Sequence, residues 1–183
     1  DRWSRQDALS THMWWHLALR YLATGDAGRV LDVHDRTIDG ATTPFRLGDV
    51  TSLLWRLELA GHDVGDRWDR LADRWAGLDE RHTCAFIDLH AAMAFARRPD
   101  HRAVPGWLAG VAGAGVGEPT ANAAVLRDVG RPLVDAFMSF GRGDRASCRA
   151  TIDALTGDRH RIGGSVAQRD VITLTRRAAG EQP

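Results

Sequence analysis

Apolar residues recur every three or four positions along most of the chain, a spacing that places side chains on one face of an α-helix. The clearest stripe lies in residues 47–57 and consists of Leu47, Val50, Leu53, Leu54 and Leu57. Alternation of apolar and polar residues, which is typical of half-buried strands, is nearly absent. The pattern therefore predicts an all-α protein whose core lies between helices.

The same spacing predicts a series of helices, and glycine, aspartate and proline residues mark where they end. We expect helices over residues 5–24, 27–38, 47–61, 67–78, 83–97, 121–141, 145–156 and 166–179. Residues 40–45 are expected to form a loop. The glycine-rich residues 105–119 give little support to a helix, because glycine disfavours the helical conformation. Pro132 should kink or divide the helix that contains it.

Two junctions share one design, in which a helix ends at glycine and the next begins at aspartate. They are Gly25-Asp26 and Gly143-Asp144. Glycine accepts the left-handed conformation at a helix end, and aspartate accepts hydrogen bonds from the free N–H groups of the following helix. Because one hairpin cannot bury its apolar face alone, we expect residues 1–183 to form a single helical-repeat domain. Its predicted architecture is an antiparallel helix-hairpin array, a degenerate α-solenoid.

Three strings carry a resemblance to a known family: His12-Met-Trp-Trp-His-Leu-Ala-Leu19, the run from Ser52 to Gly61, and the run from His160 to Asp170. Over nearly all of its length the chain resembles the C-terminal part of the tetratricopeptide repeat protein 38 family. The resemblance implies a tetratricopeptide-like helical fold and a C-terminal fragment of a longer protein, which the first residue, Asp1, also indicates. It implies little about activity, because the biochemical role of that family is poorly defined.

Composition narrows the class of protein. No apolar run approaches the roughly 18 residues that cross a bilayer, and no signal peptide is visible. Cys84 and Cys148 are isolated within apolar patterns, so we expect reduced, buried thiols rather than a disulfide framework. Together these features predict a cytoplasmic protein without a membrane segment.

Charge excludes several kinds of chemistry. The formal net charge is zero, which argues against a general nucleic-acid binder. Every one of the 24 basic residues is arginine, so the segment has no lysine for Schiff-base or Walker-type chemistry. Residues 1–91 carry 11 arginines against 15 acids, whereas residues 92–183 carry 13 against 9. This asymmetry points to an anionic partner at the C-terminal end, or to self-association.

His12 and His16 are four residues apart on one predicted helix, the spacing by which a helix offers two metal ligands. Met13 follows the first histidine where the metalloprotease motif requires glutamate. Both histidines share a stripe with Trp15, so burial with hydrogen-bonded imidazoles also accounts for them. We predict no structural zinc site here and no cofactor, because a histidine pair lacks the further ligands that such a site requires.

Asp88 and His90 place a carboxylate and an imidazole two residues apart. On a helix these side chains point about 200° away from each other, so they cannot act on one atom together. Either could meet His12 or His16 across a helix interface. Such a contact has two interpretations, a structural tether and an acid–base pair.

The run from His160 to Asp170 is the most informative segment. Ser165 followed three residues later by Gln168 forms a capping box at a helix start. Beside Arg161 and Arg169, this helix start could also receive an anion. A capping role alone and a site for an anion or acidic peptide are the two interpretations.

Two functions from different classes follow. The first is a binding or scaffold module that recognises a peptide or protein partner, with a small anionic ligand as a second candidate; nucleic acid and membrane are not expected partners. The alternative is an enzyme or small-molecule-binding protein with a His/Arg/Asp pocket on the inner face of the array, although the sequence shows no nucleophile elbow or nucleotide motif. The candidate site residues are His12, His16, Asp88, His90, Asn122, Arg161, Ser165, Gln168, Arg169 and Asp170.

The separate candidate segments should meet in space if they serve one function, because buried polar groups persist only when they are paired. We therefore expect at least one of His12, His16 and His90 to lie within hydrogen-bonding reach of the turn over residues 161–170. Contact at this distance in sequence requires a tightly closed array or a loop that folds back.

Overall fold

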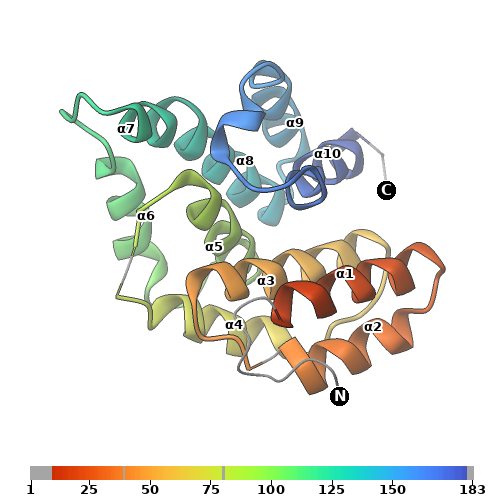
Figure 1. Cartoon of the computed structure of the whole chain (residues 1–183). Helices are drawn as coiled ribbons and strands as arrows, with labels where there is room; N and C mark the ends of the chain where they lie inside the picture. Colours follow the sequence, from red (N-terminus) through yellow and green to blue (C-terminus); the bar gives the residue numbers. More distant parts are fainter. Residues whose placement is uncertain (1–9, 39, 80, 181–183) are drawn as a thin grey trace.

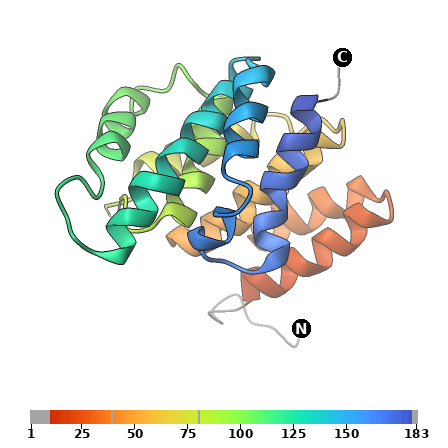
Figure 2. The ribbon, with the colours of Figure 1, turned by 90° about the horizontal axis from the view of Figure 1, so that it is seen from above.

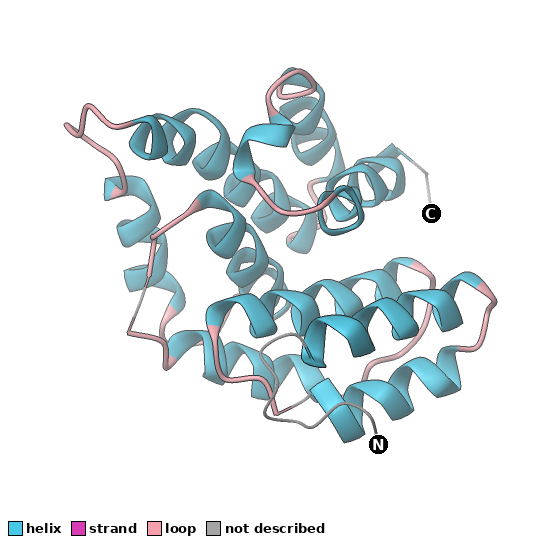
Figure 3. Cartoon of the chain, in the orientation of Figure 1, coloured by secondary structure: helices cyan, strands magenta, loops and turns pink. Residues whose placement is uncertain are grey.

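A computed structural model describes residues 10–38, 40–79 and 81–180, and all regular secondary structure within them is helical (Figure 3). The α-helices are α1 (Ser10–Ala23), α2 (Ala27–Val33), α3 (Pro44–Leu59), α4 (Arg67–Ala76), α5 (Ala85–Arg97), α6 (Val104–Gly113), α7 (Ala121–Val125), α8 (Arg131–Gly141), α9 (Arg145–Ala154) and α10 (Val166–Gly180). Shorter helical turns cover His34–Ile38, Leu126–Gly130 and Arg159–Ile162. The all-α prediction is confirmed, while residues 5–9 of the first expected helix lie outside the described residues.

Both glycine–aspartate junctions form as the sequence predicts. Gly25 and Gly143 have φ values of 77° and 83°, in the left-handed region that favours glycine. The Asp26 carboxylate accepts a hydrogen bond of 3.1 Å from the Arg29 amide, and Asp144 accepts one of 3.1 Å from Ser147. Asp66 precedes α4 in the same way, and its side chain makes no capping hydrogen bond.

Two expectations about the helices were wrong. Pro44, expected in a loop, begins α3, because its fixed φ and missing N–H suit the first helical turn. In the glycine-rich stretch, Val104–Gly113 forms α6 despite the low helix propensity of its glycines. Trp107 and Val111 on this helix are buried in the core, so tertiary packing outweighs the local preference.

The expected division near Pro132 is confirmed. A π-helical turn over Leu126–Gly130 separates α7 from α8, and proline stands in the first turn of α8. Proline cannot donate a backbone hydrogen bond, so the regular ladder is interrupted in the preceding turn. Gly130 lies in this turn at a close approach to α5, because a Cβ added there would stand only 2.8 Å from that of Ala85.

α3 is buried throughout Leu47–Leu57, and it contacts α1, α4, α5 and α10 (Figure 1). From α5 the contacts continue through α8 and α9 to α10, which then packs back against α3 (Figure 2). The Trp55 indole donates a hydrogen bond of 2.8 Å to the Thr175 hydroxyl across this last contact. The end of the described chain is therefore joined directly to its first third.

The two cysteines differ in how deeply they are buried. Cys148 is fully buried and Cys84 is half-buried, and both are free thiols. Burial raises the pKa of the Cys148 thiol to about 12, so this sulfur remains protonated at neutral pH.

Within the described ranges, no helix has both the length and the apolar character needed to cross a bilayer.

Candidate functional site

A polar stripe runs along one face of α3, within its buried stretch Leu47–Leu57. Asp49, Ser52 and Arg56 are spaced three and four residues apart, so their side chains lie on the same face. Asp49 and Arg56 are each only 5% exposed. The candidate list from sequence missed all three residues, although charged positions at helical spacing within an apolar helix were the available signal.

Asp49 joins three helices through its two carboxylate oxygens. Oδ2 accepts a hydrogen bond from Nδ1 of His12 on α1 at 3.1 Å, and Oδ1 accepts one from Nε2 of Gln168 on α10 at 3.2 Å. Nε2 of His12 in turn lies 3.1 Å from Nε2 of His16. The segments that were expected to converge are therefore linked, but through an aspartate of α3.

The expected direct contact between a histidine and the turn over residues 161–170 is absent among the described residues, because Asp49 stands between them. Burial raises the pKa of Asp49, and the neighbouring His12 opposes this shift through its charge and its hydrogen bond. A buried carboxylate is stable only when hydrogen-bond donors satisfy it. The hydrogen bonds from His12 and Gln168 to Asp49 therefore hold α1 and α10 against α3.

The capping box at the start of α10 forms in full. The backbone N–H of Gln168 donates to the Ser165 hydroxyl at 3.2 Å, and the backbone N–H of Ser165 donates to Oε1 of the Gln168 side chain at 2.9 Å. The same glutamine side chain uses its amino group for Asp49. Gln168 thus orders the start of α10 and anchors it to the hydrogen-bonded network of His12, His16, Asp49 and Gln168, called the Asp49 network below.

Ser165→Ala is expected to lower the free energy of unfolding by about 1 kcal/mol, the usual cost of losing an N-cap side chain. Urea denaturation followed by circular dichroism measures this loss. Ser147→Ala, a change at an exposed serine inside α9, is the matched control and should have a much smaller effect. Equal losses in the two variants would contradict a capping role for Ser165.

Arg56 ties α3 to the first turn of α10. Its guanidinium donates to the backbone oxygens of Ser52 at 3.0 Å and Ala167 at 2.6 Å. Burial lowers the pKa of Arg56 to about 10, while the charges of Asp170 and Asp49 oppose the shift. The group therefore remains a buried cation at neutral pH, next to the carboxylate of the same helix face.

His90 lies beside this network and makes no hydrogen bond to it. Its Nδ1 donates to the Phe86 carbonyl at 2.7 Å, while its Nε2 is buried without a hydrogen-bond partner. Burial lowers the pKa of His90 to about 4, and the charge of Arg56 adds to the effect. At neutral pH this histidine is an uncharged part of the core.

The remaining candidates have local partners instead. Asp88 is paired with Nδ1 of His82 at 3.0 Å, facing away from His90 as the helical geometry predicts. The Asn122 side chain donates to the Thr83 carbonyl at 3.1 Å. An exposed ion pair of 3.1 Å joins Arg161 to Asp158. None of these three contacts involves the Asp49 network, so these candidates do not belong to one site with it.

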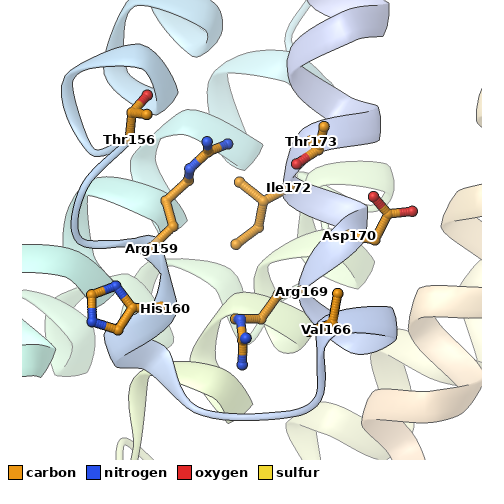
Figure 4. A pocket seen from close by; sticks show the side chains of 8 residues that line it. All are labelled: Thr156, Arg159, His160, Val166, Arg169, Asp170, Ile172 and Thr173. Carbon is orange, nitrogen blue, oxygen red and sulfur yellow. The ribbon is translucent and has the colours of Figure 1, made fainter.

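A pocket of about 250 Å³ lies between α10 and the turn that follows α9 (Figure 4). The residues that line it are Thr156, Arg159, His160, Val166, Arg169, Asp170, Ile172 and Thr173. Arg169 and Asp170 were sequence candidates, whereas Arg159 and His160 were not. The signal that could have identified them is the concentration of arginine and histidine just before the predicted helix start.

The pocket is rich in hydrogen-bond donors. Nη1 of Arg159 is buried and has no hydrogen-bond partner, although the charge of this arginine also contributes, after Arg176 and Arg149, to the lowered pKa of Asp153. Nη1 of Arg169 donates to the backbone oxygens of Gly163 and Gly164, which holds the loop before α10. The one carboxylate in the lining, Asp170, interacts with Arg56 on its other side. The lining therefore contains two arginines and a histidine against a single carboxylate.

Across the described residues, no group of three or more His, Cys, Asp or Glu side chains is placed to hold a metal ion. In comparisons with known proteins, no family model matches the chain and no solved structure matches it.

Proposed function

We propose that the chain is a helical binding module that recognises a peptide or protein partner and takes an acidic group of that partner into the pocket between the Arg159–Ile162 turn and α10. The observation that carries the proposal is the buried Nη1 atom of Arg159, which has no hydrogen-bond partner in a pocket lined also by Arg169 and His160. An unpaired buried donor is costly, and an incoming carboxylate or phosphate oxygen would satisfy it.

The size of the pocket favours one side chain over a larger ligand. Sites for drug-sized molecules usually span about 300–1,000 Å³, whereas this pocket has a volume of about 250 Å³. An acidic side chain fits this space while the rest of a peptide lies on the surface outside. Val166 on the rim is 77% exposed and offers an apolar contact for such a peptide.

The tetratricopeptide-like arrangement is part of the proposal. Its support is the hairpins α1–α2 and α8–α9, each closed by the same glycine–aspartate device. Helical arrays of this kind hold peptides along their inner surface. α10 packs back against α3, and the pocket proposed to take the acidic group is lined by residues of α10.

The proposal is tested by NMR titration with a blocked heptapeptide of alanines with one central glutamate, and with the same peptide carrying glutamine instead. We expect the glutamate peptide to shift the amide signals of the pocket residues and the glutamine peptide to leave them unchanged. Arg159→Gln should weaken binding at least tenfold, because it removes the charge and the fork of donors. Arg131→Gln, at an exposed arginine at the start of α8, should bind as the unmodified protein does.

The second candidate, a small-molecule-binding protein or enzyme, is favoured by one observation. His12, Asp49 and Gln168, from three different helices, form one hydrogen-bonded chain. Titration with inorganic phosphate separates the two functions. A peptide-binding module should bind the glutamate peptide more tightly than free phosphate, whereas tighter binding of phosphate, or no response in the pocket, would overturn the proposal.

A further inference from the structure

The two histidines of α1 present a pair of nitrogen atoms at the surface, on the side of the Asp49 network that faces away from α10. The Nε2 atoms of His12 and His16 lie 3.1 Å apart, and the two ring planes are nearly perpendicular at 83°. His16 is exposed, and the side chain of His12 is 30% exposed. Both imidazole side chains are therefore in contact with the solvent.

Asp49 determines which nitrogen of His12 is available. Its carboxylate accepts a hydrogen bond from Nδ1 of His12, so this nitrogen carries the proton. In a neutral imidazole the other nitrogen then has a free lone pair. The lone pair of Nε2 on His12 consequently lies next to Nε2 of His16, and the two atoms share one proton in the absence of another ligand.

This separation is close to the one that a metal ion requires. Two imidazole nitrogens bound to zinc at about 2.0–2.1 Å with tetrahedral angles stand about 3.3–3.4 Å apart. The observed 3.1 Å differs from this by a few tenths of an ångström, which small rotations of two partly exposed rings can supply.

The surroundings of His12 have the composition of a metal-ligand shell. A ligating histidine commonly donates its other N–H to a carboxylate, which fixes the ring and makes the ligating nitrogen more basic. Asp49 occupies this place, and its second oxygen is held by Gln168 at 3.2 Å. The negative charge of Asp49 favours a cation, while the buried cation Arg56 on the same helix opposes it.

We propose that His12 and His16 bind one divalent transition-metal ion, of the Zn²⁺, Ni²⁺ or Cu²⁺ kind, through their Nε2 atoms, with Asp49 as a positioning residue behind His12. Since the described residues contain no group of three protein ligands, water completes the coordination and the ion is exchangeable. Such an open site differs from the closed structural zinc site that the sequence argues against. It is also independent of the pocket beside α10.

The test uses untagged protein and isothermal titration with ZnCl₂ and NiSO₄. We expect one ion per chain, and binding that weakens as the pH falls, because the imidazoles must be neutral to bind. His16→Gln should weaken binding at least tenfold while the midpoint of urea denaturation stays unchanged, since His16 is exposed. His62→Gln, at a partly exposed histidine on the loop after α3, is the matched control and should bind as the unmodified protein does.

A second readout locates the ion. The ring of His12 stacks on Trp15 with 5.4 Å between the centroids, so bound Cu²⁺ should quench tryptophan fluorescence in the unmodified protein and not in His16→Gln. Asp49→Asn should weaken binding about 10–100-fold and change the nitrogen NMR signals of His12, as expected of a residue that sets its tautomer. The proposal would be overturned if the unmodified protein bound the metal ion no more tightly than His16→Gln does. It would also be overturned if His62→Gln lost metal binding to the same extent as His16→Gln.

Discussion

Leu54→Ala is expected to lower the free energy of unfolding by about 2–5 kcal/mol, the range measured when a buried leucine is truncated in a packed core. The Leu54 side chain is fully buried at the centre of α3. α3 contacts α1, α4, α5 and α10, so a cavity there weakens the element on which the others depend. Removing three carbons from this fully buried site leaves a space that the neighbours refill only in part.

The measurement is chemical denaturation in urea, compared with that of the unmodified protein. Leu174→Ala on α10 is the matched control, because this leucine is only half-buried and lies outside the core cluster. It should cost about 1 kcal/mol or less. A loss at Leu54 smaller than that of Ser165→Ala would show that the polar network, rather than the apolar stripe of α3, carries most of the stability.

The stability of the protein is expected to fall by about 3 kcal/mol through His90 alone as the pH is lowered from 6.5 to 4. The pKa of His90 is lowered from 6.5 to about 4 by burial, so the unfolded chain binds a proton in this range that the folded chain does not. The contribution is therefore fully present above pH 6.5 and is lost as the pH falls through the folded-state pKa.

His90→Gln removes this dependence while retaining a donor for the Phe86 carbonyl. The difference in unfolding free energy between pH 7 and pH 4 should thus be about 3 kcal/mol smaller in the variant. His160→Gln, at an exposed histidine, should keep the pH dependence of the unmodified protein. If His90→Gln does not fold, NMR titration of the His90 ring in the unmodified protein decides the same point, and protonation near pH 6.5 would contradict the prediction.

Features that depend on neighbouring residues could be predicted from the sequence. The glycine–aspartate junctions and the capping box each involve side chains and amides within a few residues, so local geometry determines them. α6 was missed because its stability comes from Trp107 and Val111 in the core, a contribution that helix propensity does not contain.

The candidate site was predicted only in part, for a related reason. The sequence indicates that the histidine turn and Gln168 need buried partners, but it does not reveal which helix supplies them. That partner is Asp49, and it serves both because α10 packs back against α3. A contact between residues this far apart follows from the path of the whole chain, which no local pattern specifies.

The link between Asp49 and Gln168 also has a consequence for the order of events during synthesis. The two residues are separated by 119 positions, and ribosomes add about 5–20 residues per second, so about 6–24 s pass between them. During this interval the Asp49 carboxylate exists without its amide donor, and Trp55 exists without Thr175. The helices synthesised first therefore remain incompletely packed until α10 is made. The Asp49 network then forms in one of the last steps of folding.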